Sequence, residues 1–211
     1  IGVVNTYLTE RYSGISVEYV NRRQLNALKT LLPNSGSVLD VACGVGRLNA
    51  IFRGQKYKVT GLDSSKEMLK KCPYKFKIIG DASNIPFKDE SFDILVTTRF
   101  LHHYGNPDDL LKEFKRVVKN GGFIIFETYR WSLKKFYFKR NKGGKIFVHR
   151  DKKIEEIVKN LNLQLKSKKS ILLLSPFVYK HLPYFFVRTL HLIENLISER
   201  LRYDVFWLVK K

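Results

Sequence analysis

Acidic residues follow two consecutive β-rich runs, at positions where carboxylates could bind a nucleoside. Asp63 comes directly after the run 57–62, and Asp81 with Ala82 follows the run 76–79. The carboxylate of Asp63 could accept hydrogen bonds from both hydroxyls of a ribose, and Asp81–Ala82 could hold an exocyclic amine such as that of adenine. Either acid alone could equally be the N-cap of the next helix. The signal becomes specific because the acids come in order after successive strands.

The run before these two, residues 37–41, leads into a loop with two glycines one residue apart. Gly44 and Gly46 follow Asp40 closely. Glycine lets the backbone turn tightly and lets a ligand approach with no side chain between. The loop does not fit a dinucleotide-binding fingerprint, because the third glycine of G-x-G-x-x-G would fall at Asn49. The glycine loop is therefore a weak signal by itself.

Alternating strands and helices must position these residues. The expected strands are 37–41, 57–62, 76–79, 92–98 and 123–129, and helical patterns begin near Ser64 and Asn106. Strands joined by right-handed helical crossovers form a parallel, doubly wound α/β sheet. Such a sheet binds ligands at the carboxyl ends of its strands. The second half departs from this alternation. It predicts a helix at 154–161, a strand at 164–174, an aromatic helical segment at 183–201 and a final strand at 203–209.

Composition and cysteine usage exclude several classes of protein. The 211 residues are 44% hydrophobic and 27% charged, which is typical of one folded domain and not of a disordered chain. No apolar stretch approaches the roughly 18–20 residues of a membrane span, and the first residues lack a signal-peptide pattern. Cys43 and Cys72 cannot form a disulfide framework and lack zinc-ligand spacing. We expect no metal and a reducing, cytoplasmic setting.

The charge balance is strongly basic. The formal net charge is +20, and residues 130–169 carry 14 basic and three acidic residues. An anionic partner would explain this excess, whether nucleic acid, a membrane surface or a phosphorylated metabolite. A general solubility bias of the source organism is the alternative.

Five segments together carry a family resemblance: 40–46, 61–63, 80–82 with 85–87, 91–96 leading to 101–103, and 110–122. They resemble the class I S-adenosylmethionine-dependent methyltransferases. The small single-domain group related to the ubiquinone/menaquinone and other small-molecule methyltransferases is the most similar. The resemblance covers residues 35–129 as a cofactor-binding core. It implies a Rossmann-like, seven-stranded, mostly parallel sheet whose last strand is antiparallel. Ala42 stands where glycine is commoner in the family, and its methyl group is expected to be tolerated.

The resemblance implies that S-adenosylmethionine is bound at the strand ends. It places the methionine part near Asp40, which orients the loop, and near Ala42, Cys43, Gly44, Gly46, Thr98 and Arg99. It places the ribose at Asp63 and the adenine near Ser64, Met68, Asp81 and Ala82.

The predicted chemistry requires little from the protein. A sulfonium methyl is already activated, so displacement mainly needs an acceptor held at near-attack distance. A base helps if the acceptor is a hydroxyl. The candidate catalytic residues are His102, His103 and Tyr12, with His149 and His181 as further candidates. Packing and capping near the fourth strand is the competing interpretation of the histidine pair.

Three segments of this single domain, 1–211, could build the acceptor side: an N-terminal helical cap at 1–30, a basic insert at 130–150 and an aromatic, helical lid at 175–202. Aromatic and basic residues alternate in the insert. They could contact RNA, an anionic membrane surface or only solvent. The lid carries aromatic rings that we expect to roof an apolar acceptor pocket. The competing interpretation is that they are ordinary core. The rings in question are Phe177, Tyr179, Tyr184 and Phe185.

These features favour a small-molecule or lipid/glycan-linked acceptor and peripheral association with a membrane. A tRNA or rRNA methyltransferase is an alternative, although the chain has no appended RNA-binding module. The position of the Asn/Asp-Pro-Pro-aromatic motif of amino-group methylation reads Thr97-Thr98-Arg99-Phe100. A non-catalytic, cofactor-binding partner subunit is a further alternative. The acceptor atom and the oligomeric state stay open.

Overall fold

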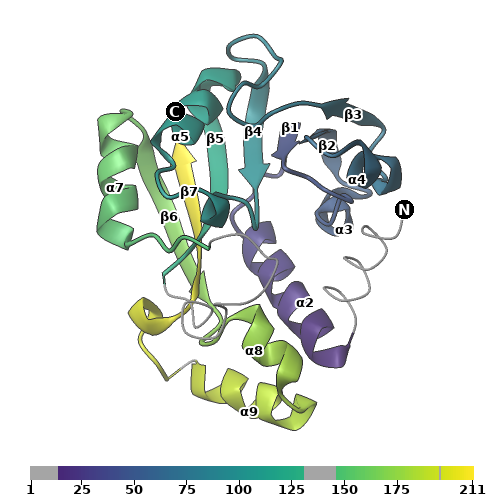
Figure 1. The fold of residues 1–211 in the computed structure, drawn as a ribbon. Helices are drawn as coiled ribbons and strands as arrows, with labels where there is room; N and C mark the ends of the chain where they lie inside the picture. The colour runs from purple at the N-terminus through teal and green to yellow at the C-terminus, as the bar shows by residue number, and fades with distance from the viewer. Residues whose placement is uncertain (1–13, 131–145, 195) are drawn as a thin grey trace.

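A seven-stranded sheet in the order β3-β2-β1-β4-β5-β7-β6 forms the centre of the molecule (Figure 1). The computed structural model describes residues 14–130, 146–194 and 196–211. The strands are β1 (Ser35–Val41), β2 (Lys56–Asp63), β3 (Phe76–Ile79), β4 (Phe92–Thr97), β5 (Val118–Tyr129), β6 (Gln164–Ile171) and β7 (Asp204–Lys210). The α-helices are α2 (Ile15–Lys29), α3 (Asn49–Phe52), α4 (Lys66–Lys71), α5 (Asp108–Val117), α7 (Asp151–Asn160), α8 (Pro176–His181) and α9 (Tyr184–Glu194). Two 3₁₀ turns, η1 (Leu101–His103) and η2 (Glu199–Leu201), complete these elements.

The strands of the sheet are mostly parallel. The central strands β1 and β4 are parallel and largely buried, as in sheets covered on both faces. β7 is antiparallel to both β5 and β6, so it is the one strand of this sheet that runs against the others. The predicted doubly wound, mostly parallel α/β sheet with an antiparallel last strand is confirmed.

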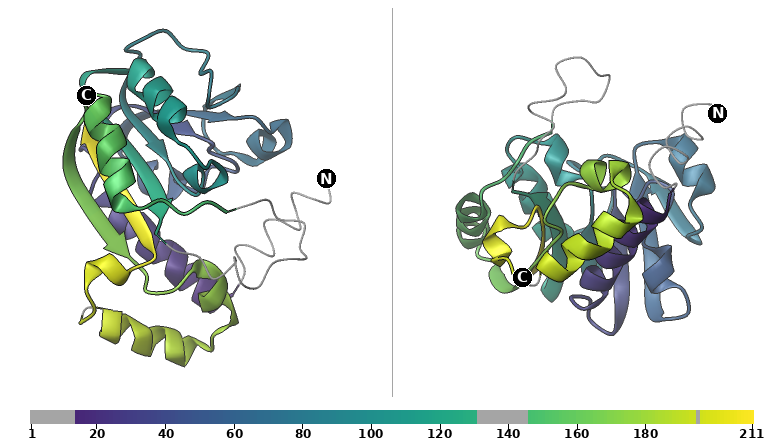
Figure 2. Two further views of the ribbon diagram at one scale, coloured as in Figure 1. Left: turned by 60° about the vertical axis from the view of Figure 1, so that its left-hand side comes forward. Right: turned by 90° about the horizontal axis from the view of Figure 1, so that it is seen from below.

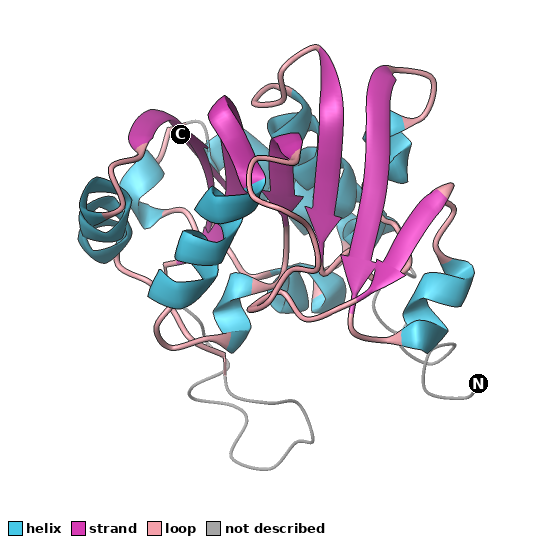
Figure 3. Ribbon diagram, turned by 90° about the horizontal axis from the view of Figure 1, so that it is seen from above, coloured by secondary structure: helices cyan, strands magenta, loops and turns pink. Residues whose placement is uncertain are grey.

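Helices cover both faces of the sheet (Figure 3). One core contains Phe114 from α5 and Ile154 from α7. The other contains Leu28 from α2, Phe52 from α3 and Val187 from α9. The carboxyl ends of the parallel strands therefore lie at one edge of the sheet, between the helices that cover its two faces. This is the edge at which the sequence predicts that a ligand binds. In the part of the chain that the structure describes, no helix has the length and apolar character needed to cross a membrane.

The second half differs from the sequence prediction in three places. The sixth strand ends at Ile171, because Leu172 has a left-handed backbone (φ 58°) that turns the chain. α8 is a short helix that the sequence does not predict. The predicted helix at 183–201 is wrong beyond Glu194, where α9 ends. The carboxylate of Glu194 is turned inward and accepts a hydrogen bond from the Leu173 backbone N–H. Residues 1–13 of the predicted cap and 131–145 of the predicted basic insert lie outside the described residues.

Candidate functional site

The loop after β1 has an unusual backbone. Ala42, Gly44 and Gly46 all have left-handed conformations, with φ values of 55°, 56° and 76°. A Cβ atom on Gly46 would lie 2.6 Å from Cδ of Pro73 and 2.8 Å from Sγ of Cys72, so packing requires glycine there. A Cβ atom on Gly44 would meet nothing within 4 Å. Gly44 therefore presents bare backbone to open space, which suits close approach of a ligand.

Asp63, at the end of β2, holds this loop in place. One carboxylate oxygen accepts a hydrogen bond from the Gly44 N–H at 2.7 Å, and the other accepts one from the Ser65 N–H at 2.9 Å. β1 and β2 pair in parallel, which brings the end of β2 beside the start of the loop. Each oxygen has a second lone pair for a ligand hydroxyl. The predicted acid and the predicted glycine loop thus form one unit.

Asp40 lies beneath the loop and is only 2% exposed. Its carboxylate accepts a hydrogen bond from the Tyr74 hydroxyl at 2.7 Å. Burial raises the pKa of Asp40 to about 7, and the Tyr74 hydrogen bond opposes this shift. The role of Asp40 in orienting the loop stays a prediction.

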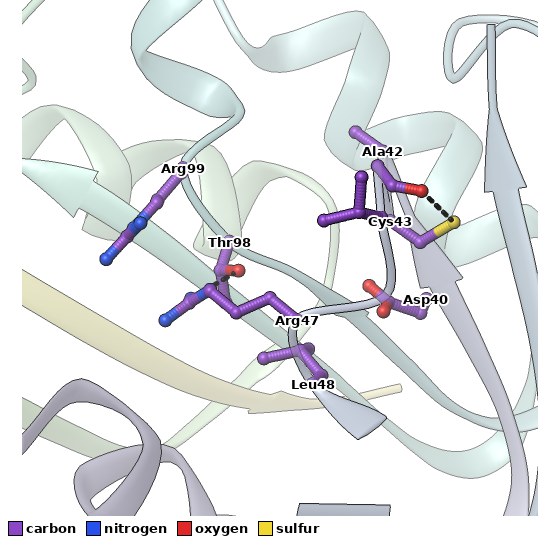
Figure 4. A pocket seen from close by; sticks show the side chains of 9 residues that line it. Asp40, Ala42, Cys43, Arg47, Leu48, Thr98 and Arg99 are labelled. Carbon is purple, nitrogen blue, oxygen red and sulfur yellow. Dashed lines mark hydrogen bonds between the residues drawn. The ribbon is translucent and has the colours of Figure 1, made fainter. Parts of the chain in front are cut away.

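A pocket lies between the glycine loop and the end of β4 (Figure 4). Its lining includes every residue that the resemblance places beside the methionine part of the cofactor, except Gly46. Those lining residues are Asp40, Ala42, Cys43, Gly44, Thr98 and Arg99. The enclosed volume of about 70 Å³ is enough for only part of a nucleoside-sized ligand. The remainder of such a ligand would extend along the carboxyl ends of the neighbouring strands.

Two guanidinium groups line the same pocket. Arg47 donates a hydrogen bond to the Thr98 hydroxyl at 2.8 Å, which Figure 4 shows, and another to Asn21 of α2 at 2.9 Å. Arg99 donates to the side-chain oxygen of Gln24, also on α2. Paired guanidinium groups are suited to binding a carboxylate. Arg47 is not among the residues that the sequence predicts for the site, although its place next to Gly46 is a signal that could have found it.

A buried polar cluster continues from Arg99 away from the pocket. Gln24 donates to Asp204 at 2.6 Å and to Glu127 at 3.3 Å, and the Arg99 backbone N–H donates to Glu127 at 2.7 Å. Burial, together with the nearby Glu127 carboxylate, raises the pKa of Asp204. The sequence carries one signal of this cluster, because Gln24 lies on the same buried face of α2 as Val20 and Leu28.

The residues predicted for the adenine lie outside the pocket. Asp81 accepts hydrogen bonds from the Ser83 N–H and hydroxyl, both at 2.8 Å, and therefore caps its own turn. Ala82 is buried, Ser64 is exposed and Met68 is half-buried. The N-cap of α4 is Ser65. Their roles in binding adenine remain predictions.

Of the predicted bases, His102, His103 and His149 lie near the end of β5, and none of these three lines the pocket. His102 is buried and stacks on Tyr129, with 4.7 Å between ring centroids, while His103 is exposed. Nε2 of His149 lies 2.9 Å from the Tyr104 carbonyl oxygen, and burial lowers the pKa of His149. Their use as general bases stays a prediction. His181 is exposed on α8, and Tyr12 lies outside the described residues.

Of the predicted lid rings, the three that the structure describes do not line the pocket. Tyr179 is buried and donates a hydrogen bond to Glu194. Tyr184 and Phe185 are exposed. The side chain of Phe177 lies outside the described part of the chain. Neither sequence interpretation holds for the described rings, because they neither line this pocket nor all belong to the core.

Comparisons with known proteins agree with this architecture. Residues 39–126 match the methyltransferase domain family. The chain is 34% identical over 110 residues to the demethylmenaquinone methyltransferase of Thermotoga maritima, covering 49% of this chain and 48% of that protein. It is 33% identical over 115 residues to the malonyl-[acyl-carrier protein] O-methyltransferase of Salmonella typhimurium, covering 52% and 46%. The chain spans about half the length of these curated relatives.

The fold is also shared with a solved S-adenosylmethionine-dependent methyltransferase of Thermotoga maritima. That structure matches 100% of this chain and 95% of its own, with a TM-score of 0.66 and 21% identity. The fold is therefore Rossmann-like, and its residues 39–126 match a methyltransferase domain. The match of residues 39–126 to a methyltransferase domain confirms the resemblance to S-adenosylmethionine-dependent methyltransferases found in the sequence.

Proposed function

We propose that this chain transfers the methyl group of S-adenosylmethionine to a small-molecule or lipid-linked acceptor. One observation carries the proposal. The open backbone at Gly44 is tied to the Asp63 carboxylate and faces a pocket that Arg47 and Arg99 also line. A ligand with a ribose at one end and a carboxylate at the other matches this order of groups.

The residues present fit that cofactor. The free lone pairs of Asp63 would accept hydrogen bonds from the two ribose hydroxyls. Arg47 and Arg99 would bind the carboxylate of the methionine part by charge-assisted hydrogen bonds. When bound, the cofactor would supply an activated sulfonium methyl group, whose carbon the acceptor would attack in line while the methyl–sulfur bond breaks and S-adenosylhomocysteine leaves. The protein's task is to hold cofactor and acceptor in line and to exclude water.

Gln24, Glu127 and Asp204 form the hydrogen-bonded cluster that holds Arg99, so the part of the pocket wall proposed to bind the cofactor's carboxylate is held in place. The curated relatives include enzymes named for demethylmenaquinone, for malonyl-[acyl-carrier protein] and for phthiotriol and phenolphthiotriol dimycocerosates. Their names support a small or lipid-linked acceptor and do not select one.

A methyl-transfer screen tests the proposal. The protein is incubated with methyl-labelled S-adenosylmethionine and with separate lipid, metabolite and RNA extracts. Label in the lipid or metabolite fraction, lost in an Asp63→Asn variant, is the expected result. Label only in RNA would favour the RNA methyltransferase alternative. Cofactor binding without transfer to any fraction would favour the non-catalytic subunit.

A further inference from the structure

α8 and α9 pack against α2 on the side of the sheet where the parallel strands end (Figures 1 and 2). The Ser16 hydroxyl of α2 donates to the Leu182 carbonyl at 3.1 Å, and Arg23 of α2 forms an ion pair with Glu194 of α9. The side chains of Asn21 and Gln24, also on α2, bond to the two arginines of the pocket. α2 therefore connects α9 to the candidate site.

α9 turns apolar side chains toward solvent. Val187 and Glu194 face inward and are buried. The outer face of α9 consists of Phe185, Phe186, Leu192 and Ile193, and it continues to Leu196. Phe185 is 72% exposed, Leu192 67% and Leu196 86%. Single exposed apolar residues are ordinary, but five on one short segment form a patch that typically marks an interaction site.

The position and charge of this face indicate the kind of partner that it would bind. α9 lies at the outer edge of the molecule, as Figure 2 shows, so it suits a flat surface better than a narrow groove. Arg188 on α9, Lys180 on α8 and Arg200 in η2 are exposed beside it. Of the acids in this segment, Glu194 is buried against Arg23, which leaves Glu199 exposed. The local charge is therefore positive.

The net charge of the whole chain points the same way. With a formal net charge of +20, two copies would repel each other, whereas an anionic lipid surface would attract the protein. Helices with an apolar face and flanking cations lie in the headgroup region of bilayers.

We infer that the outer face of α9 docks on an anionic bilayer and presents the methyltransferase pocket, across α2, to an acceptor held in that membrane. This inference rests on the proposed function for its acceptor, but the docking itself can be measured without catalysis.

Vesicle co-sedimentation tests the docking. The vesicles contain phosphatidylcholine with or without about one third phosphatidylglycerol. The test variant is Phe185→Ser, alone and combined with Leu192→Ser. The matched control is Phe76→Ser on the edge strand β3, where the ring is 58% exposed and also has a lysine beside it (Lys75 Nζ lies 5.5 Å from its centroid).

We expect wild type to bind the anionic vesicles, and to bind less as salt rises. Phe185→Ser should weaken binding about tenfold and the double variant about a hundredfold, since each removes apolar surface from the bilayer contact. Phe76→Ser should bind within about twofold of wild type. Equal binding of all variants, or no binding by wild type, would overturn the inference. So would light scattering that shows a dimer abolished by Phe185→Ser, because the face would then belong to a second copy.

Calorimetry with S-adenosylmethionine on the same variants separates the two proposals. Unchanged cofactor affinity in every α9 variant is expected, because the outer face does not contact the pocket. Loss of vesicle binding with retained cofactor binding would show that the substitution affects only the contact between α9 and the membrane. If wild type binds vesicles but not S-adenosylmethionine, the proposed function fails while the docking surface stands.

Discussion

Replacing Asp40 by Asn should change how the stability of the protein depends on pH. Asp40 is buried, its carboxylate accepts a hydrogen bond from Tyr74, and burial raises its pKa to about 7. In the unfolded chain an aspartate has a pKa near 3.9. Asn has nearly the same shape, and its side-chain oxygen can accept the same bond from Tyr74. The substitution therefore removes the ionisation and little else.

The sign of the effect follows from proton binding. As pH rises above about 4, the unfolded state releases the Asp40 proton while the folded state keeps it until about pH 7. Wild-type stability therefore falls with rising pH through this window. A shift of about three pKa units corresponds to roughly 4 kcal/mol at most, of which roughly 2–3 kcal/mol develops between pH 5 and pH 8.

Urea unfolding at pH 5 and pH 8 measures this directly. The free energy of unfolding of Asp40→Asn minus that of wild type should increase by roughly 2–3 kcal/mol from pH 5 to pH 8. Taking the difference in unfolding free energy between the two proteins cancels the contributions of the other titrating groups. Tyr74→Phe is the control. It removes the hydrogen bond that stabilises the charged form, so its stability should fall more steeply with pH than that of wild type. Parallel pH curves for wild type and Asp40→Asn would refute the reasoning.

Three further changes have defined outcomes. Gln24→Leu removes the donor to the buried acids Glu127 and Asp204. Its free energy of unfolding in urea should therefore be about 2–4 kcal/mol lower than that of wild type. An unchanged unfolding midpoint would contradict a stabilising role of Gln24 in the cluster. Arg47→Met should weaken binding of S-adenosylmethionine about ten- to a hundredfold in calorimetry. Decarboxylated S-adenosylmethionine should bind wild type and this variant equally, and an equal loss for both ligands would exclude carboxylate binding. Ala42→Gly should raise stability by up to about 1 kcal/mol, because glycine relieves the left-handed strain that alanine carries; a destabilised variant would show that the strain is absent.

The first half of the fold could be predicted from sequence because its signals are local. Each of the first three predicted strands leads into an acid or a glycine loop, and parallel pairing brings those ends to one edge. Asp63 and the Gly44 loop therefore meet as the sequence predicts.

The rest depends on contacts between distant residues. Gln24 meets Asp204 only because α2 crosses the end of a sheet in which β7 lies beside β5. No local pattern records that crossing. The predicted helix at 183–201 is wrong beyond Glu194, where α9 ends. The buried Glu194 forms an ion pair with Arg23 of α2, which is another contact between distant residues. Helix propensity alone predicts a helix that continues past this residue.

Calorimetric titration with S-adenosylmethionine tests the central claim most directly. Three proteins are compared: wild type, Asp63→Asn, and Glu67→Gln as a charge-matched control. Glu67 is exposed on the neighbouring helix α4. Wild type should bind one cofactor per chain. Asp63→Asn should weaken binding by about thirty- to a hundredfold, since it loses the charge on the ribose hydrogen bonds, while Glu67→Gln should stay within about twofold. No binding by wild type, or equal affinity in all three proteins, would contradict a cofactor site built on Asp63 and the Gly44 loop.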